Sequence, residues 1–148
     1  MADQKTKAPA LTMENYFFSE VHVAMNPDVN QENIESRKAF NYDFTKKVDI
    51  FANKEENDLY MVVLTITNET ADGARAEDIT LKVNGLFRLP PNLEEDKIQK
   101  LLRILAPSML YGSAREFLLT ITSRGPFPPV YLPTTSFIPE PPTESLEP

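Results

Sequence analysis

The sequence has no cysteine and no tryptophan, a single histidine and only four glycines among its 148 residues. Without cysteine, disulfides, thiolate nucleophiles and zinc–thiolate sites are excluded. His22 has no second histidine at a metal-ligand spacing, and we expect it to face solvent from a strand. P-loop, GxSxG and GxGxxG motifs are also missing. The sequence therefore predicts no cofactor, no metal site and no enzyme activity.

The charge balance narrows the range of partners. There are 22 acidic and 15 basic side chains, giving a net charge of −7 at pH 7. Such a chain meets like charge at a nucleic-acid backbone and at an anionic membrane surface. The N-terminus lacks an apolar run of signal-peptide length, and no segment approaches the roughly 20 apolar residues of a membrane span. We expect a cytoplasmic protein that binds no nucleic acid and is not embedded in a membrane.

The length predicts one domain with a tail at each end. Residues 1–10 are small and polar and are expected to be disordered. Residues 139–148 are acidic and rich in proline, which predicts an extended and mobile tail. The folded domain is expected to occupy residues 11–138.

Four segments of the domain have the pattern of β-strands. The predicted strands are Tyr16–Met25, Phe40–Phe51, Leu59–Thr67 and Ile79–Leu89. Strict alternation in the first strand places Phe17 with Val21 on one face and Phe18 on the other. The third strand is apolar on both faces, which predicts a central and covered position. A long connection is expected over residues 26–38, and a hairpin connection at Asp72-Gly73.

Two helices are predicted after the strands. Pro90-Pro91 ends the fourth strand, and Asn92 with Glu95 has the spacing of a capping box. The first apolar stripe comprises Ile98, Leu101, Leu102 and Leu105, and the second comprises Leu110, Ala114, Phe117, Leu118 and Ile121. Pro107 is expected to separate the helices, and Gly125-Pro126 to end the second.

Strands followed by helices predict an α+β fold with an antiparallel sheet. Both faces of the sheet carry apolar side chains in places, and two helices cannot cover all of them. A second copy of the chain is the simplest cover for the remainder.

The second half of the sequence contains three ordered motifs: Gly85-Leu86-Phe87, Pro107-x-x-Leu110-x-x-x-Ala114-Arg115-Glu116 and Ser123-Arg124-Gly125-Pro126-Phe127-Pro128. In these motifs and their order, the sequence resembles the SecB family of protein-export chaperones. Compatible segments upstream extend the resemblance to about residues 13–138.

This resemblance implies a four-stranded antiparallel sheet followed by two helices, assembled as a dimer of dimers. Two dimers would pack through their first helices into a homotetramer. Long apolar grooves would hold unfolded secretory precursors as a holdase, keep them competent for translocation and deliver them to the SecA ATPase. The location implied is the bacterial cytoplasm.

Candidate residues follow from the side chains that suit an adaptable apolar surface. We expect the client-binding groove to include Phe40, Tyr42, Phe44, Tyr111, Phe117, Leu118, Phe127, Val130, Tyr131 and Phe137; the alternative for each is a place in the core or a subunit interface. The first helix stripe, Ile98, Leu101, Leu102 and Leu105, is assigned to the oligomer interface.

The resemblance also implies an acidic face for SecA on the first and fourth strands. Glu20 matches one of its carboxylates, whereas Ala24 and Thr80 stand where acidic residues are expected. Gly112-Ser113 replaces the usual Pro-Tyr. These departures favour an alternative, a SecB-like chaperone dedicated to one client such as an antitoxin. A third hypothesis, a small enzyme or ligand-binding domain, requires convergent buried polar groups, of which the strands offer few.

Overall fold

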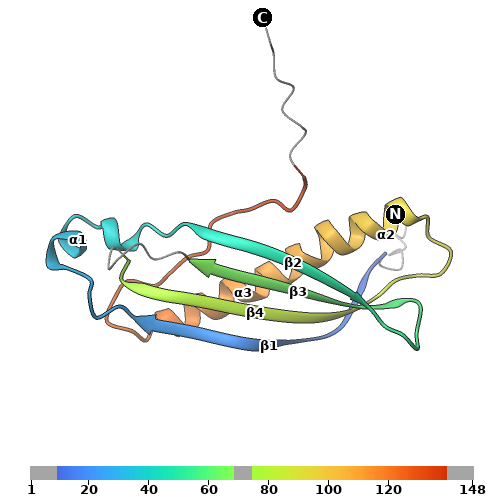
Figure 1. Cartoon of the computed structure of the whole chain (residues 1–148), viewed down its shortest axis with the longest axis horizontal. Coiled ribbons are helices and arrows are strands. Elements are labelled where there is room, and N and C mark those ends of the chain that lie inside the picture. Colours follow the sequence, from blue (N-terminus) through green and yellow to red (C-terminus); the bar gives the residue numbers. More distant parts are fainter. Residues whose placement is uncertain (1–9, 69–74, 140–148) are drawn as a thin grey trace, which may run out of the picture.

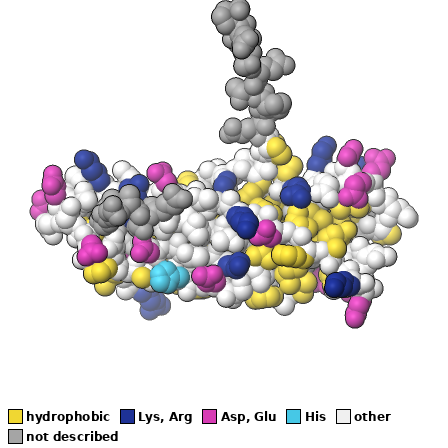
Figure 2. All heavy atoms as spheres, viewed as in Figure 1, with side chains coloured by type: hydrophobic (Ala, Val, Ile, Leu, Met, Phe, Trp, Pro, Cys, Tyr) yellow, Lys and Arg dark blue, Asp and Glu magenta, His cyan; other side chains and the backbone are white. Residues whose placement is uncertain are grey.

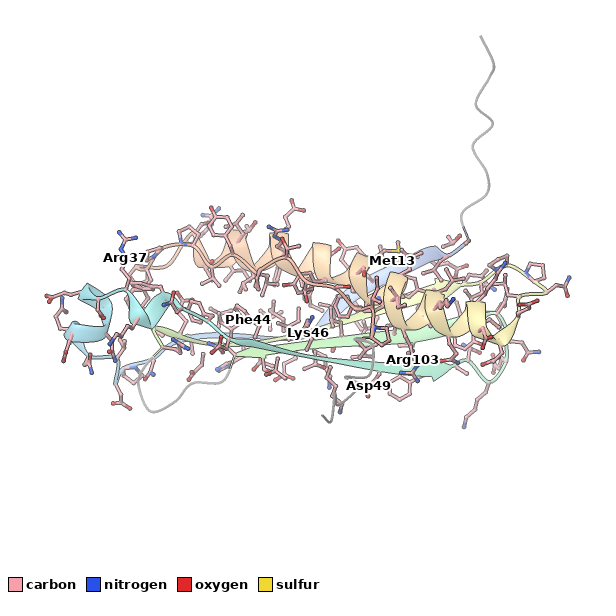
Figure 3. The ribbon with its side chains drawn as sticks, turned by 90° about the horizontal axis from the view of Figure 1, so that it is seen from above. Met13, Arg37, Phe44, Lys46, Asp49 and Arg103 are labelled. Carbon is pink, nitrogen blue, oxygen red and sulfur yellow. The ribbon has the colours of Figure 1, made fainter. Side chains whose placement is uncertain are left out.

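The computed structural model describes residues 10–68 and 75–139. Within these ranges the strands form one antiparallel sheet in the order β1-β4-β3-β2, and a long helical rod covers one of its faces (Figures 1 and 3). The strands are β1 (Thr12–Met25), β2 (Phe44–Ala52), β3 (Leu59–Asn68) and β4 (Glu77–Arg88). The predicted α+β class with a four-stranded antiparallel sheet is confirmed. The predicted tails, apart from Ala10 and Pro139, and the Asp72-Gly73 turn lie outside the described residues.

The two inner strands, β3 and β4, carry most of the core. Residues of β4 alternate regularly between buried and half-buried, and the buried set faces the helical rod. In β3, Val62 and Leu64 are fully buried on the helix side, and Val63 is only 8% exposed on the opposite side. This agrees with the predicted central position of the third strand. The apolar side chains that fill the space between sheet and rod are Ile66, Ile79, Leu81, Val83, Phe87, Leu102, Leu110 and Leu118.

The faces of the edge strand β1 differ from the prediction. The register between β1 and β4 shifts between Phe18 and Glu20, which places an extra residue, Ser19, in the strand. Phe18 and Val21 both lie opposite inward-facing residues of β4, whereas Phe17 lies opposite an outward-facing one. The predicted common face for Phe17 and Val21 is therefore wrong, because a β-bulge breaks the two-residue period.

The connection between β1 and β2 contains short helical turns that the sequence pattern did not predict. These are α1 (Gln31–Glu35) and the 3₁₀ turn η1 (Lys38–Phe40). The amide of Phe40 donates to the carbonyl of Arg37 at 3.2 Å, so the backbone here is turned rather than extended. Strand β2 accordingly begins at Phe44, and the predicted strand start at Phe40 is wrong.

The predicted break between two helices is also wrong. One continuous rod runs through α2 (Glu95–Lys100), the π-helical segment η2 (Leu101–Leu105) and α3 (Ala106–Thr122). Pro107 is buried near the start of α3. The amide of Ala106 donates to the carbonyl five residues earlier, which is the wider hydrogen-bond spacing of a π turn. This wider turn comes directly before Pro107, and the helix accommodates a residue that has no amide hydrogen to donate.

The start of the rod lies two residues later than the capping box predicted. Asn92 has a left-handed backbone with φ of 63°, and Glu94 occupies the N-cap position. Glu95 accepts a hydrogen bond from the side chain of Gln99 at 3.0 Å instead of reaching back to Asn92. The predicted Asn92–Glu95 capping box does not form, because Asn92 lies outside the first turn.

The sheet face opposite the rod carries an apolar row at one end. Phe51, Met61 and Leu86 are cross-strand neighbours on β2, β3 and β4, and Phe51 is 57% exposed. Figure 2 shows hydrophobic side chains gathered over this end of the molecule. In Figure 3, Lys46 lies on the helix side of the sheet and Asp49 on the opposite side. Among the described residues, no helix combines the length and the apolar character needed to cross a membrane.

Candidate functional site

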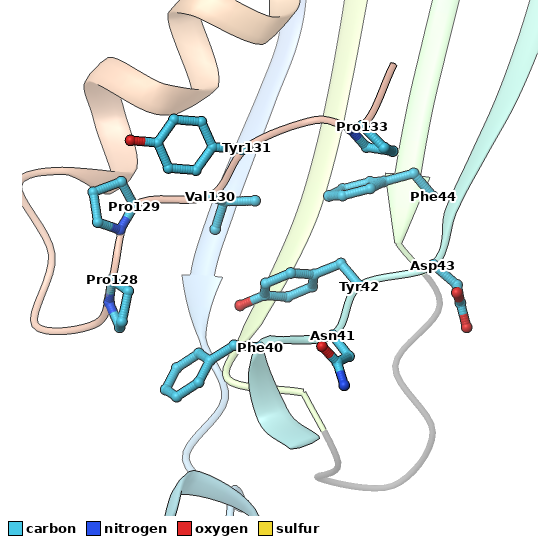
Figure 4. Close-up of a pocket in the computed structure, with 10 residues that line it drawn as sticks. All are labelled: Phe40, Asn41, Tyr42, Asp43, Phe44, Pro128, Pro129, Val130, Tyr131 and Pro133. Atoms are coloured by element: carbon cyan, nitrogen blue, oxygen red, sulfur yellow. The ribbon is translucent and has the colours of Figure 1, made fainter. Parts of the chain in front are cut away.

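The candidate site is an open pocket between the start of β2 and the extended segment that follows α3 (Figure 4). Its volume is about 350 Å³. One side is formed by Phe40, Tyr42 and Phe44, and the opposite side by Val130 and Tyr131. The remaining lining residues are Asn41, Asp43, Pro128, Pro129 and Pro133. The pocket is thus lined mainly by aromatic, aliphatic and proline side chains.

The segment after α3 is held in place by alternate residues. Val130 and Leu132 are buried, whereas Tyr131 between them is 65% exposed. The hydroxyl of Thr122, in the last turn of α3, donates to the carbonyl of Leu118 and accepts from the amide of Val130, both at 2.8 Å. Prolines fix φ along the same segment and keep it extended. Tyr131 is therefore presented to solvent by a well-anchored backbone.

Aromatic side chains contact one another along the pocket. The ring centroids of Phe40 and Phe127 lie 5.8 Å apart, as do those of Tyr42 and Phe44. Six of the ten predicted groove residues are thus brought together: five line the pocket, and Phe127 contacts its edge through Phe40. Both ring pairs are tilted, and together they place four aromatic rings along the pocket and its edge.

Two other predicted groove residues form a separate contact further along the tail segment. The hydroxyl of Tyr111 donates to the carbonyl of Pro133, and its ring meets Phe137 edge to face at 5.9 Å. The ammonium of Lys46 lies 4.7 Å from the centroid of Phe137 and also donates to Thr135. These contacts tie the tail segment across α3 and β2.

The last two predicted groove residues belong to α3 and pack against the sheet. Phe117 stacks on Phe18 with centroids 4.2 Å apart, and Leu118 is fully buried in the core. The residues predicted for the oligomer interface also differ in burial. Leu102 is buried at 1% exposure, whereas Leu105 is 42% exposed; Ile98 and Leu101 are half-buried.

The residues assigned to an acidic face lie on the side of the sheet opposite the rod. Glu20 is exposed and lies opposite Lys82 of β4. Ala24 and Thr80 belong to the same face, as does His22, which is exposed. The described residues contain no group of three or more His, Asp or Glu side chains positioned to hold a metal ion.

One buried acid near the pocket was not among the predicted residues. Glu77 is 4% exposed and lies on the inward face of β4, in line with Ile79. Burial raises the pKa of its carboxyl above the usual value. The pKa of Tyr42 is also raised, first by burial and then by the negative charge of Glu77. Glu77 could have been found from the sequence. It occupies an inward-facing position in the alternation of β4, yet its side chain is charged.

The hydroxyl of Tyr42 is buried and has no hydrogen-bond partner within the described residues. The positive charge of Arg75 partly offsets the rise in the pKa of Tyr42. The Arg75 guanidinium donates to the carbonyl of Lys38 at 2.9 Å and lies 3.5 Å from Asp43. The site therefore offers apolar area and aromatic faces, together with the polar side chains of Asn41 and Asp43. Such a surface suits an extended, apolar polypeptide, because it accepts side chains of different shapes.

Comparison with known proteins places the chain in a family. Residues 5–138 match the family model described as preprotein translocase subunit SecB. The chain is 35% identical over 101 residues to the protein-export protein SecB of Cellvibrio japonicus, covering 68% of this chain and 60% of that protein. It is 31% identical over 117 residues to the Chromohalobacter salexigens protein of the same name, covering 74% and 71% respectively.

A solved structure shares the fold. It is a SecB-like chaperone of Mycobacterium tuberculosis in complex with a peptide from an antitoxin. The TM-score is 0.66, with 13% identity, over 85% of this chain and 91% of that chain. The family match over residues 5–138 establishes that this chain belongs to the SecB family.

Proposed function

We propose that this chain is a chaperone of protein export that holds unfolded polypeptides, its clients, in the aromatic pocket and its surroundings. The observation that carries the proposal is the open pocket itself, with Phe40, Tyr42 and Phe44 facing the exposed Tyr131. A holdase needs an exposed apolar surface that can bind many different sequences. It does not need catalytic residues. Membership of the SecB family supports the same function.

The proposed assembly is a homotetramer built from two dimers. Leu105 is 42% exposed on the rod, and Ile98 and Leu101 are only half-buried. A partly exposed apolar stripe of this kind is typical of a surface that another subunit covers. In that assembly the tetramer would keep precursors translocation-competent in the cytoplasm and deliver them to SecA.

For the SecA contact we propose the sheet face opposite the rod, with Glu20 as a contributing carboxylate. Ala24 and Thr80 on that face supply no charge, so the electrostatic part of the contact rests on fewer groups. A Glu20→Lys variant should weaken SecA binding while leaving precursor binding unchanged. Binding of both partners can be measured by surface plasmon resonance, and loss of precursor binding as well would contradict this assignment.

The experiment that tests the holdase function is suppression of aggregation. A reduced, unfolded secretory precursor is diluted with and without the chain, and light scattering is recorded. Tyr131→Ser should suppress aggregation less well than the wild type, because it removes exposed aromatic area from the pocket. Phe51→Ser is the matched control, since Phe51 is 57% exposed on the opposite sheet face. Absence of suppression by the wild type would refute the function.

A dedicated chaperone is the second candidate. The related fold from Mycobacterium tuberculosis is described with an antitoxin peptide, and the outer face here lacks acidic residues at Ala24 and Thr80. Affinity purification of the native chain from its own cells separates the two candidates. Many precursors support the general function, and one dominant, stoichiometric partner supports the dedicated one.

A further inference from the structure

Residues 134–139, which we call the strap, are fastened to the protein only by side chains. Val130 and Leu132 just upstream are buried, whereas the strap residues are exposed or half-buried. No hydrogen bond between backbone groups joins the strap to the rest of the described chain, and the amide of Ile138 donates only to the nearby hydroxyl of Ser136, at 3.2 Å. A segment with few buried contacts and a solvent-exposed backbone opens at a low cost in free energy.

Two side chains hold the strap in place, and both contact Lys46 of β2. The Lys46 ammonium donates to the hydroxyl of Thr135 and lies 4.7 Å from the centroid of the Phe137 ring. The same ring meets Tyr111 of α3 edge to face, with the ring centroids 5.9 Å apart. Phe137 therefore lies between β2 and the helical rod and contacts both of them.

The strap lies where the aromatic pocket would otherwise continue along β2. Phe44 is the last residue of this strand that lines the pocket. Alternate residues of a strand share a face, so Lys46, Val48 and Ile50 continue the row of Phe44 on the helix side of the sheet (Figure 3). All of them are half-buried. The first position beyond the pocket, Lys46, is the one that Phe137 contacts.

We propose that the strap is an autoinhibitory segment that a client displaces, an inference that rests on the proposed function. While the strap is in place, the apolar row on β2 ends at Phe44, and a client reaches only the aromatic pocket. When the strap leaves, the row extends over the stem of Lys46 toward Ile50. The strap has the chemistry of a client, because it is a stretch without helix or strand that carries Phe137 and Ile138 among small polar residues.

The part of the segment that opens is limited by its anchors. Val130 and Leu132 are buried, and Thr122 accepts the amide hydrogen of Val130, so the wall that presents Tyr131 stays in place. Only the residues after Pro133 move. A closed strap lowers the apparent affinity for a client by the fraction of molecules in which it is open.

The first test measures the affinity of the full chain for a fluorescein-labelled unfolded peptide rich in aromatic and aliphatic residues, by fluorescence anisotropy. Phe137→Ser should bind this peptide about threefold to tenfold more tightly than the wild type, because the strap loses one cation–π contact and one aromatic pair. Thr135→Val, which removes the acceptor for Lys46, should shift the affinity in the same direction.

Ile138→Ser is the matched control. Ile138 is 65% exposed, so its replacement removes apolar area from the strap without releasing it, and the affinity should equal that of the wild type. Urea unfolding of each variant checks that the fold is retained. A weaker or unchanged affinity of Phe137→Ser would overturn the inference, because the ring would then contact the client or have no competing role.

The second test follows the strap directly. The chain has no tryptophan, so Phe137→Trp introduces a single indole that can keep the contacts to Lys46 and Tyr111. When an unlabelled, tryptophan-free peptide saturates the site, the emission should shift to longer wavelength, because the indole leaves these contacts for water. A shift to shorter wavelength, or no shift, would overturn the inference, since the indole would then remain covered.

The outcomes separate this inference from the proposed function. Peptide binding by the wild type without a gain in Phe137→Ser overturns the inference and leaves the holdase function intact. Failure of the wild type and of every variant to bind the peptide overturns the proposed function and the inference together.

Discussion

Phe18 of β1 and Phe117 of α3 stack with ring centroids 4.2 Å apart and an interplanar angle of 28°. The contact joins the edge strand to the helical rod. It exists because the bulge at Ser19 turns Phe18, and not Phe17, toward the helix. Two neighbouring residues of the same type thus have different roles in the fold.

The first prediction compares these two phenylalanines. Phe18→Ala should lower the free energy of unfolding by about 2 kcal/mol, because it removes a half-buried ring and its stacking contact with Phe117. Phe17→Ala should cost less than about 1 kcal/mol, since Phe17 is 43% exposed on the outer face. Urea unfolding measures both. A larger loss for Phe17→Ala would contradict the assigned strand faces.

The second prediction concerns two glycines. A Cβ at Gly85 would lie 2.5 Å from Phe87 Cε2 and 2.8 Å from Leu110 Cδ2, so Gly85→Ala should lower the free energy of unfolding. We expect a loss of roughly 1–3 kcal/mol, the usual cost of overpacking. Gly112→Ala is the matched control: nothing lies within 4 Å of its Cβ, and alanine in α3 should add up to about 1 kcal/mol. Thermal unfolding distinguishes the opposite signs.

The third prediction concerns Asp58 and its partner Arg88. One guanidinium nitrogen of Arg88 lies 2.9 Å from each carboxylate oxygen of Asp58, and this hydrogen bonding lowers the pKa of the Asp58 carboxyl. A lowered folded-state pKa adds stability above the ordinary value of 3.8, and that stability disappears as the pH falls through the lower folded-state value. Asp58→Asn should therefore lower the melting temperature at neutral pH.

At a pH well below 3.8 the wild type and Asp58→Asn should have the same melting temperature. Asp28→Asn, which removes an exposed carboxylate on another loop, should leave the melting temperature unchanged at both pH values. A melting-temperature difference for Asp58→Asn that persists in acid would show that charge is not its cause.

The fourth prediction concerns Glu77, whose pKa is shifted in the opposite direction. Burial raises its folded-state pKa above the ordinary 4.5, so the folded protein holds the proton more tightly than the unfolded chain does. Stability from this group is present below that ordinary value and declines as the pH rises through the raised value. Polar or charged groups near it include Tyr42, Arg75, Thr122 and Arg124.

Glu77→Gln should therefore be more stable than the wild type at neutral pH, and the difference should shrink as the pH falls toward 4.5. Urea unfolding at several pH values provides the measurement. The exposed Glu20→Gln serves as the control and should follow the wild type throughout. A loss of stability in Glu77→Gln at neutral pH would indicate that the carboxylate is paired in solution.

The fifth prediction concerns assembly. Leu105→Glu should reduce the mass measured by light scattering, because it places a charge on the exposed end of the first helix stripe. Ile138→Glu, at a position that is 65% exposed on the tail segment, should not change the mass. A wild-type chain that is monomeric at micromolar concentration would contradict the proposed tetramer directly.

Much of the fold could be predicted because its central strands obey simple alternation. β4 follows the inward and outward pattern from Ile79 to Phe87, and β3 is apolar on both faces. The errors occur where a local irregularity of the backbone interrupts the expected alternation or helix period. The extra residue Ser19 reverses two faces, a π turn absorbs Pro107, and a 3₁₀ turn holds Phe40 out of the strand.

The candidate site was predictable in part for a similar reason. Phe40, Tyr42 and Phe44 are close together in the sequence, so their proximity could be expected even though the turn at Phe40 removes the strand that the prediction assumed. Their position opposite Val130 and Tyr131 depends on the path of the chain after α3, which periodicity does not encode. The burial of Leu118 and Leu102 depends on how the rod sits on the sheet, which an apolar stripe alone leaves undetermined.

The π turn at Leu101–Leu105 has a mechanical consequence. Had Pro107 broken the helix, the stripe around Leu105 and the segment carrying Tyr111 would be two bodies joined by a joint. With the rod intact, both belong to one continuous helix, whose residues Tyr111 and Thr122 hold the segment after α3 by hydrogen bonds. In the proposed assembly, a displacement of the rod by a docking subunit would be transmitted to that segment.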